Sequence, residues 1–360
     1  MISPRLSRRE ILRCWLGGLT ASLFAVATFG VLGCQQESQS SATGSSVPAG
    51  ESAAGLPPKP EGAFKIGLIT PGSTKTDKAW SGLAWEGVQN VAKETGATVT
   101  PPVEGPDAAS VAGALRNLAQ EGDQLIFLHG SEYDEAASSI APDFPKTTFV
   151  VVGGRTEKPN LTPINFSAGG AVYLAGMVAG SMTKTNKIAC VGGSEIPIVK
   201  EAFENFAEGA KSVNPAADVR VVFTGDEKDI AKAKQQTQAL LGEGVDVVQH
   251  NANDAGRGVA QAVEGKPGTY FMGANADQSD LATKQNLGSF VLDVPSAYLA
   301  VGKRVAEGKG DGKAVKAGLA EHAVYFKFND RFGGTIPQEV KDKVAAAEKD
   351  IIAGKVAIKK

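Results

Sequence analysis

Short apolar runs alternate with helix-length amphipathic segments from Phe64 onward, and this rhythm constrains the fold more than any other feature of the chain. The runs are continuous stretches of Val, Ile, Leu and Phe, which is typical of strands buried on both faces of a parallel sheet. Gly follows several helical segments, as expected at helix C-termini. The predicted strands are residues 64–70, 98–103, 124–130, 148–154, 187–193, 218–225, 245–251, 269–275, 289–294 and 324–328.

The pattern predicts an α/β protein with two Rossmann-like lobes, each built on a parallel sheet flanked by helices. Ten strands are more than one doubly wound sheet usually carries, and the pattern restarts at residue 187 after the long helical segment 169–184. In such sheets ligands bind outside the carboxyl ends of the strands. A cleft between two lobes would therefore collect loops from both sheets.

The N-terminal segment is predicted to be an export signal. Four arginines precede an apolar run over residues 15–32, and Gly33 precedes Cys34. A small residue before the cysteine and a polar segment after it indicate a lipoprotein, in which residues 1–33 are cleaved and Cys34 is lipidated. An uncleaved anchor is the alternative, since the run could span a bilayer, and the Arg pair leaves open the general or the twin-arginine route. Residues 34–61 form a predicted flexible tether.

The export signal and the lipidated cysteine together predict a protein of the cell envelope. It would be lipid-anchored to the membrane and exposed on the periplasmic or extracellular side. The formal net charge is -2 at pH 7, with 42% hydrophobic and 21% charged residues. Such mild acidity argues against nucleic acid as a partner. With Cys14 in the signal and Cys34 at the lipid site, Cys190 alone remains, in an apolar strand pattern typical of a buried, unreactive thiol.

No motif of an enzyme is found. The loop after the first strand lacks the GxxxxGK[ST] spacing, no GxGxxG opens the first helix, and HExxH and GxSxG do not occur. The only histidines are His129, His250 and His322, and the first two are interpreted as strand-end residues that make hydrogen bonds. The sequence therefore predicts a protein that is not an enzyme, with no cofactor and no metal.

The loops after the predicted strands instead offer amides, hydroxyls, carboxylates and aromatic rings, which suit a small polar ligand. Trp80 and Tyr133 are notable because a large amphipathic ring is costly to leave in a loop without a partner. Packing of Trp80 on its own helix is the alternative, and Asn or Asp at strand ends often serve as turn formers or helix caps. The predicted ligand-binding residues are Ser73, Asp77, Trp80, Ser131, Tyr133, Glu195, His250, Asn251, Asn275 and Asp277.

Five segments carry a family resemblance: DKAWSGLAWEG (77–87), residues 173–197, SVNP (212–215), LLGEGVDVVQHNAND (240–254) and GANADQSD (273–280). They resemble, in the same order, the basic membrane protein family of solute-binding lipoproteins, whose best-known members are purine nucleoside receptors. The resemblance spans residues 64–360. It implies a periplasmic-binding-protein fold of type I with three crossovers, which closes on a ligand and delivers it to an ABC permease. The implied lobes are residues 62–166 plus 292–322, and 167–291 plus 323–360.

The resemblance assigns Asp77 and Trp80 to the family's first binding loop, and Ser131 with Tyr133 to the loop after the third strand. It assigns Asn251 to the loop before the seventh helix. Asn275 takes the position that holds a ribose-binding Asp in nucleoside receptors.

Several departures leave the ligand open between nucleobase and nucleoside. Ser81 stands where nucleoside receptors have Asn, and Leu292 or Asp293 stands in place of a Lys. Ser194 and Glu195 stand where relatives have an aromatic or Pro, which argues against a two-sided aromatic sandwich.

The predicted function is a monomeric substrate-binding lipoprotein of an ABC importer with a purine nucleobase or nucleoside-like ligand. The alternatives are a ligand-sensing lipoprotein that signals to a partner, and a binding protein for a different small polar solute. A nucleoside hydrolase would require a carboxylate cluster that the loops lack.

Overall fold

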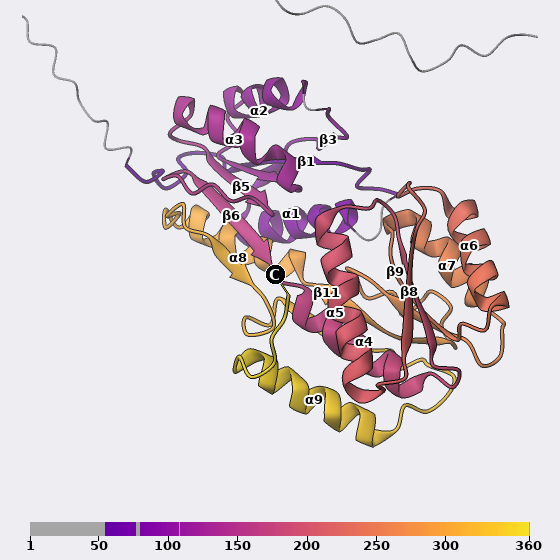
Figure 1. Cartoon of the computed structure of the whole chain (residues 1–360). Helices are drawn as coiled ribbons and strands as arrows, with labels where there is room; N and C mark the ends of the chain where they lie inside the picture. The colour runs from indigo at the N-terminus through magenta and orange to yellow at the C-terminus, as the bar shows by residue number, and fades with distance from the viewer. Residues whose placement is uncertain (1–54, 77–79, 108, 360) are drawn as a thin grey trace, which may run out of the picture. The chain divides into compact units, whose positions relative to one another are not determined.

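The structure is a computed structural model that describes residues 55–76, 80–107 and 109–359. The predicted export signal, Cys34 and most of the tether lie outside the described residues, and so does Asp77. Residues 53–360 form one compact unit, whose strands build two sheets (Figure 1).

The first sheet is parallel throughout. Its strands are β1 (Lys65–Thr70), β2 (Thr98–Val99), β3 (Val103–Glu104), β4 (Leu125–Leu128), β5 (Thr148–Val152), β6 (Leu161–Phe166) and β12 (Val315–Ala317). The order across the sheet is β12-β6-β5-β4-β1-β2, and β3 also pairs with β1. Ile69 of β1 pairs with Leu128 of β4, which pairs with Val151 of β5. The carboxyl ends of these strands therefore lie at one edge.

The second sheet is parallel except for one edge strand. Its strands are β7 (Lys187–Gly192), β8 (Asp218–Phe223), β9 (Val247–Asn251), β10 (Tyr270–Gly273), β11 (Asn286–Leu292) and β13 (Val324–Phe328). Their order is β13-β11-β10-β9-β7-β8, with β13 antiparallel to β11. Gly192 of β7 pairs with Asn251 of β9, so that these two strands end together.

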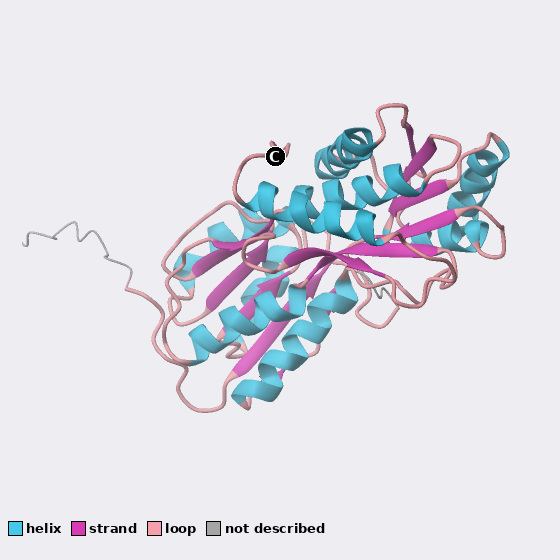
Figure 2. Ribbon diagram, turned by 90° about the horizontal axis from the view of Figure 1, so that it is seen from below, coloured by secondary structure: helices cyan, strands magenta, loops and turns pink. Residues whose placement is uncertain are grey.

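Helices cover both faces of the strands (Figure 2). The α-helices are α1 (Ser81–Thr95), α2 (Val111–Gln120), α3 (Asp134–Ile140), α4 (Gly169–Met182), α5 (Pro197–Val213), α6 (Ile230–Gly242), α7 (Gly256–Val263), α8 (Val294–Ala306) and α9 (Gln338–Ile352). Short 3₁₀ turns are η1 (Ser131–Tyr133), η2 (Ala141–Asp143) and η3 (Asn253–Ala255).

Alternate residues of a buried strand enter opposite hydrophobic clusters, because successive side chains of a strand point to opposite faces. In the first sheet, Leu68 joins a cluster with Val88 of α1, whereas Ile69 joins one with Leu115 of α2. In the second sheet, Cys190 joins a cluster with Phe206 of α5. Strands covered on both faces explain the continuous apolar runs of the sequence.

Cys190 is fully buried, and burial raises the pKa of its thiol well above the ordinary value. The thiol therefore stays protonated, which confirms the interpretation of Cys190 as a buried and unreactive residue.

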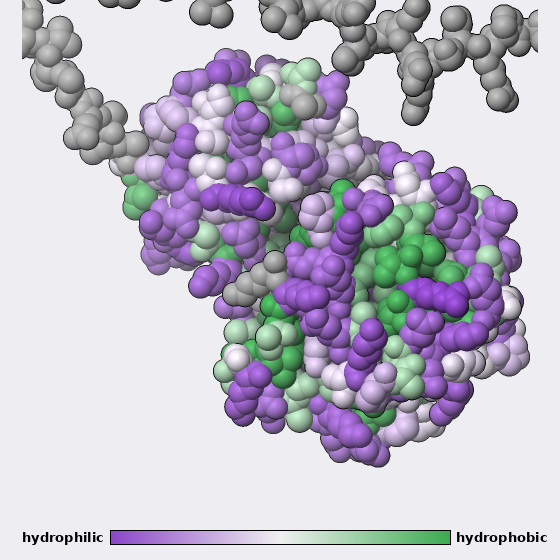
Figure 3. Space-filling model, in the orientation of Figure 1, coloured by the Kyte–Doolittle hydropathy of each residue, from purple (hydrophilic) through white to green (hydrophobic). Residues whose placement is uncertain are grey.

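β8 differs from the expected pattern of burial on both faces. It is the edge strand of the second sheet, and Val221 in its middle is 44% exposed. On the face shown in Figure 3, apolar side chains gather over β8. The apolar run in the sequence therefore predicts the strand correctly but overestimates its burial.

Helices α4 and α5 pack closely because glycines stand where they cross. A Cβ added to Gly176 of α4 would lie 2.0 Å from the carbonyl oxygen of Phe206, and one added to Gly209 of α5 would lie 2.0 Å from the carbonyl oxygen of Tyr173. Backbone carbonyls cannot yield as side chains do, so these positions require glycine. The small residues in the long apolar segment 169–184 thus serve helix packing.

Two strands of the first sheet, β6 and β12, have no predicted counterpart. β6 contains Pro163, which pairs with Val151 although proline lacks the N–H that a strand interior uses. β12 has only three residues. The predicted strand 98–103 is divided into β2 and β3, with Pro101 and Pro102 between them.

The chain passes between the two sheets at three places. It leaves the first sheet after β6, returns from the second after β11, and leaves again between β12 and β13. Two of these segments are joined, because the N–H of Asp293 donates to the carbonyl oxygen of Ala323 (2.8 Å). Within the described residues, none of the helices has the length and apolar character needed to cross a membrane.

Candidate ligand-binding site

Trp80 lies directly before α1, at the carboxyl edge of the first sheet, and its side chain is half-buried. Its ring packs against the core cluster of α1 and α8, and the ring centroids of Trp80 and His129 are 4.0 Å apart with a 35° tilt. The indole is thus held from one side by an imidazole at the end of β4. A half-buried ring supported in this way is suited to stacking on a flat ligand.

His129 is fully buried, and its position depends on Tyr298 of α8. The Tyr298 hydroxyl lies 2.8 Å from His129 Nδ1, and the Tyr298 ring stacks on Phe127 at 4.0 Å with an interplanar angle of 11°. The interpretation of His129 as a hydrogen-bonded strand-end residue is therefore confirmed. Tyr298 was not among the predicted site residues.

Asn251 and Asn275 meet at the carboxyl edge of the second sheet. Asn275 Nδ2 donates to Asn251 Oδ1 (3.2 Å), and the N–H of Leu292 donates to the carbonyl oxygen of Asn275 (3.0 Å). Asn275 has φ +64°, a left-handed conformation that Asn tolerates better than most residues. Both side chains are half-buried. This amide pair can both donate to and accept from a polar ligand.

Gln278 fixes the loop that carries Asn275. Its Oε1 accepts from the N–H of Ala274 (3.1 Å) and lies 2.6 Å from His250 Nε2. The N–H of Gln278 donates to Ser289 Oγ (3.2 Å), which attaches the same loop to β11. Nothing in the segment GANADQSD had marked Gln278 as more than a turn residue.

His250 holds this loop through its contact with Gln278, and the side chain of His250 is almost fully buried, with 1% exposed. A Cβ on Gly256 would lie 2.1 Å from His250 Nδ1, so the imidazole fills the space that this glycine leaves. Burial lowers the pKa of His250 to about 4, against the opposing effect of its hydrogen bond to Gln278. The ring is therefore neutral at pH 7, with Nε2 donating to Gln278. The predicted role of His250 as a direct ligand contact does not fit this burial, whereas its interpretation as a hydrogen-bonded strand-end residue does.

Tyr133 is a core residue in the structure. It is 3% exposed and belongs to the cluster formed by α2, α3 and the strands they cover. Burial raises the pKa of its hydroxyl. The expectation of an aromatic ring standing in a loop was wrong for Tyr133, because η1 turns the side chain back toward the sheet.

The four remaining predicted residues that the structure describes, which exclude Asp77, lie on or near the surface. Ser131 lines a hollow of about 670 Å³ together with Glu132, Thr156 and Lys158. Ser73 accepts a hydrogen bond from the N–H of Lys75 (3.3 Å).

Glu195 and Asp277 form exposed ion pairs. Lys200 Nζ lies 3.0 Å from Glu195 Oε1, and Lys327 Nζ lies 2.7 Å from Asp277 Oδ2. Partial burial of Asp277 opposes ionisation, but hydrogen bonds from Lys327 and Ser279 outweigh it and hold the pKa of this carboxyl below its usual value. Exposed pairs of this kind contribute little to stability.

The described part of the chain contains no group of three or more His, Cys, Asp or Glu side chains that could hold a metal ion. What the structure gathers is an aromatic ring with its support at the edge of one sheet, and an amide pair at the edge of the other. Two mostly parallel sheets with polar and aromatic loops at their carboxyl edges define the class of two-lobe, periplasmic-binding-protein-like proteins.

Comparison with known proteins identifies the family. The model of the Bmp family, described as ABC transporter substrate-binding protein PnrA-like, matches residues 63–360, and the chain belongs to this family. It is a family of solute-binding proteins and not of enzymes.

Two curated relatives and one solved structure illustrate the range of similar proteins. The ABC transporter nucleoside-binding protein BmpA of Lactococcus lactis subsp. cremoris is 28% identical and covers 94% of this chain and 98% of its own. The transcriptional activator protein med of Bacillus subtilis is 27% identical, covering 69% of this chain and 77% of its own. The structure of an ABC transporter solute-binding protein from Conexibacter woesei has a TM-score of 0.70 at 25% identity, covering 82% of this chain and 98% of its own. The fold expected from the resemblance is thereby confirmed.

Proposed function

We propose that this substrate-binding protein takes a purine nucleobase or a nucleoside-like ligand, stacked on Trp80. The observation that carries the proposal is the Trp80 ring at the carboxyl edge of the first sheet, backed at 4.0 Å by the buried His129. The nucleoside-binding relative from Lactococcus lactis supports the same ligand class. Such a ring accepts any flat heterocycle, because stacking does not depend on the pattern of donors and acceptors.

The amide pair Asn251 and Asn275 would read the polar edge of the ligand. We propose a binding site between two lobes, residues 62–166 plus 292–322 and residues 167–291 plus 323–360, which the division of the strands between two sheets supports. Asp77, Ser73 and Ser131 would contribute from the first lobe. Asp277 and Glu195 would lie at the rim of the second.

The proposed contacts are sufficient for useful affinity. Stacking of a base on an aromatic ring is worth about 1 to 3 kcal/mol in alanine replacements, and each good hydrogen bond about 1 kcal/mol. With apolar burial these contributions reach about -8 kcal/mol, which corresponds to micromolar binding. Closure of the lobes would follow from binding, because only the closed form lets loops of both sheets touch the ligand.

The setting we propose is that of a lipoprotein held at the outer side of the membrane by acylated Cys34. ABC transporter substrate-binding proteins serve a permease, so a small-molecule ligand and a permease are the partners. A flexible tether over residues 34–61 would allow a monomeric receptor to move between solute and permease.

The experiment begins with the purified chain, which is denatured so that any retained small molecule can be identified by mass spectrometry. Adenine, guanine, hypoxanthine and their nucleosides are then titrated calorimetrically. A purine that is retained or binds tightly supports the proposal and decides between base and nucleoside. An absence of binding across the panel would refute it, and product formed during incubation would point to a hydrolase.

Trp80→Ala should weaken binding of the preferred purine at least tenfold, a change of about 1.4 kcal/mol. Trp80→Phe serves as the matched control, since it keeps a ring and should retain most of the affinity. Circular dichroism establishes that both variants are folded. Equal affinity of the Ala variant and the unaltered chain would exclude stacking on Trp80.

A sensory role is the second candidate, and the similarity to the transcriptional activator protein med favours it. Both roles use the same ligand site, so binding does not separate them. Uptake of radiolabelled purine by cells lacking this protein does: reduced uptake indicates transport, whereas normal uptake with an altered transcriptional response to the purine indicates sensing.

A further inference from the structure

We propose that His129 and Tyr298 are positioning residues that hold the plane of Trp80 and link it mechanically to helix α8. The proposal deepens the function above, on which it rests, by naming the device that couples the stacking ring to the segments joining the two sheets. Neither residue would touch the ligand. Each would act through the next one in the series Trp80, His129, Tyr298.

The first contact of the series joins Trp80 to His129. Their ring centroids are 4.0 Å apart, and His129 is fully buried. A ring enclosed on all sides cannot tilt without displacing its neighbours, since protein interiors are close-packed. The imidazole therefore sets the tilt of the indole that lies on it.

The second contact joins His129 to Tyr298. The hydroxyl lies 2.8 Å from Nδ1, and the two rings meet edge to face at 5.9 Å. Burial raises the pKa of the Tyr298 hydroxyl well above its ordinary value, so it keeps its proton and is able to donate in this contact. The hydrogen bond fixes the rotation of the imidazole ring, which packing alone leaves less determined.

Tyr298 itself has no room to move. Its ring stacks on Phe127 at 4.0 Å, and a Cβ added to Gly87 of α1 would lie 2.9 Å from the Tyr298 ring. The glycine thus lets α1 approach α8 over the tyrosine. Because Trp80 directly precedes α1, the helix that follows the indole packs on the tyrosine that supports it.

Helix α8 begins where the chain returns from the second sheet. β11 ends at Leu292, and Asp293 caps α8 by accepting from the N–H of Ser296 (3.0 Å). The N–H of Asp293 also donates to the carbonyl oxygen of Ala323, in the segment between β12 and β13. Tyr298 stands in the second turn of α8, so a rearrangement at these two crossings reaches the tyrosine over about 1.4 helical turns.

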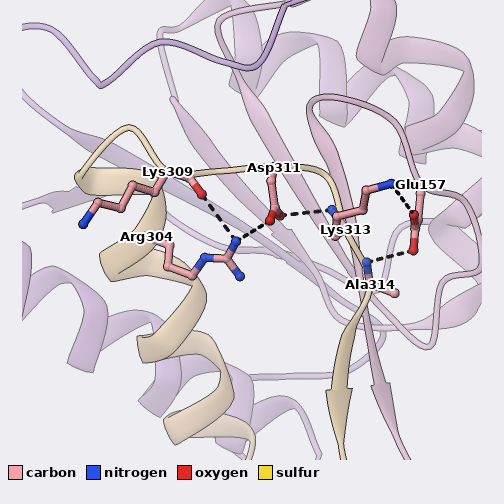
Figure 4. Close-up of polar contacts among 6 residues, drawn as sticks. All are labelled: Glu157, Arg304, Lys309, Asp311, Lys313 and Ala314. Carbon is pink, nitrogen blue, oxygen red and sulfur yellow. Dashed lines mark hydrogen bonds and ion pairs between the residues drawn. The ribbon is translucent and has the colours of Figure 1, made fainter.

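The other end of α8 is fastened to the first sheet, as Figure 4 shows. Arg304 Nη2 lies 2.6 Å from Asp311 Oδ2, and the N–H of Ala314 donates to Glu157 Oε1 (3.0 Å). Lys313 lies between these two contacts, with Nζ 3.5 Å from Glu157 Oε2. These residues are exposed and each pair is weak, but together they keep the C-terminal end of α8 beside the strand that follows it. Both ends of α8 are therefore held, the C-terminal end against the first sheet and the N-terminal end at the two crossings.

The test uses the full chain with Trp15 and Trp85 replaced by Phe, which leaves Trp80 as the single tryptophan. Tyr298→Phe removes one hydroxyl and keeps the ring on Phe127. Tyr270→Phe is the matched control, because Tyr270 lies in the second sheet against Phe332. Emission of Trp80, its quenching by acrylamide, and binding of adenosine and adenine are measured for each variant.

We expect Tyr298→Phe to alter the emission of Trp80 and raise its quenching in the ligand-free chain, and to weaken purine binding about fivefold, the equivalent of one hydrogen bond. Tyr270→Phe should leave both unchanged. Unaltered Trp80 emission and quenching in Tyr298→Phe overturn the proposal. A chain that binds no purine would refute the proposed ligand, whereas the emission of the ligand-free chain still decides the role of Tyr298.

A double variant separates positioning from stability. Tyr298→Phe removes the hydroxyl that lies 2.8 Å from His129 Nδ1, which lowers stability, whereas His129→Phe with Tyr298→Phe replaces both polar groups of this contact by rings and should recover part of the loss. If the pair positions Trp80, the thermal midpoint of the double variant lies above that of Tyr298→Phe while Trp80 emission stays altered. Recovery of both together would mean that the pair is only structural, and would overturn the proposal.

Discussion

Replacing Gln278 by Leu should release the loop that presents Asn275. The substitution keeps the side-chain volume and removes the one oxygen that accepts from both the N–H of Ala274 and His250 Nε2. Each donor left unpaired costs about 1 to 3 kcal/mol when buried. His250 is buried and bears its full cost, whereas the N–H of Ala274 regains contact with water once the loop opens.

The free energy of unfolding should therefore fall by about 3 kcal/mol, most of it from His250. In urea denaturation this loss of stability appears as a lower midpoint. The dependence of the unfolding free energy on urea concentration should not change, since the surface exposed on unfolding stays the same. Hydrogen exchange gives a local reading: the amides of residues 274–278 should exchange faster, while those of β7 keep their protection. Purine affinity should fall as Asn275 leaves Asn251.

Gln285→Leu provides a matched control at the opposite end of β11. Gln285 Nε2 donates to the carbonyl oxygens of Val263 (2.8 Å) and Lys266 (2.6 Å), and its Oε1 accepts from the N–H of Gly265 (2.8 Å). Its loss should lower stability but leave exchange at residues 274–278 and purine affinity unchanged. Unchanged exchange of residues 274–278 in Gln278→Leu, or the same loss of affinity in both variants, would refute the reasoning.

The fold could be read from the sequence because nearly every strand carries a local signal. An apolar run followed by a polar loop identified β4, β5 and β7, among others. The two strands that were not predicted, β6 and β12, depend for their pairing on neighbouring strands. β6 joins the sheet in spite of Pro163, because its neighbours β5 and β12 hold it on either side. Pairing of this kind depends on partners distant in sequence.

The candidate site was only half predictable, for a related reason. Trp80 and the amides Asn251 and Asn275 are visible as unusual loop residues. The residues that hold Trp80 in place could not be recognised in the sequence. Tyr298, for example, is 169 residues from His129 and lies in a helix without unusual sequence features. His250 precedes Asn251 by one residue, so it faces the opposite side of β9 and is buried there. A strand-end position alone does not say which of two neighbours reaches the ligand.

Two further predictions concern packing and pH. Gly176→Ala places a Cβ 2.0 Å from the carbonyl oxygen of Phe206 and should cost about 3 kcal/mol by urea denaturation. Gly113→Ala is the control, because Gly113 is exposed on α2 with no atom within 4 Å of an added Cβ, and it should stabilise by about 0.5 to 1 kcal/mol. Equal effects of the two substitutions would contradict the close helix crossing. His250 has a pKa of about 4 in the fold against 6.5 in the unfolded chain, so its contribution is complete above pH 6.5 and is lost as the pH falls through 6.5 toward 4. The loss amounts to roughly 3 kcal/mol. His250→Gln keeps a donor for Gln278 but does not titrate. Between pH 7 and pH 4 the urea midpoint of this variant should therefore fall less than that of the unaltered chain. If the midpoints of the two proteins fell in parallel with pH, a buried neutral His250 would be excluded.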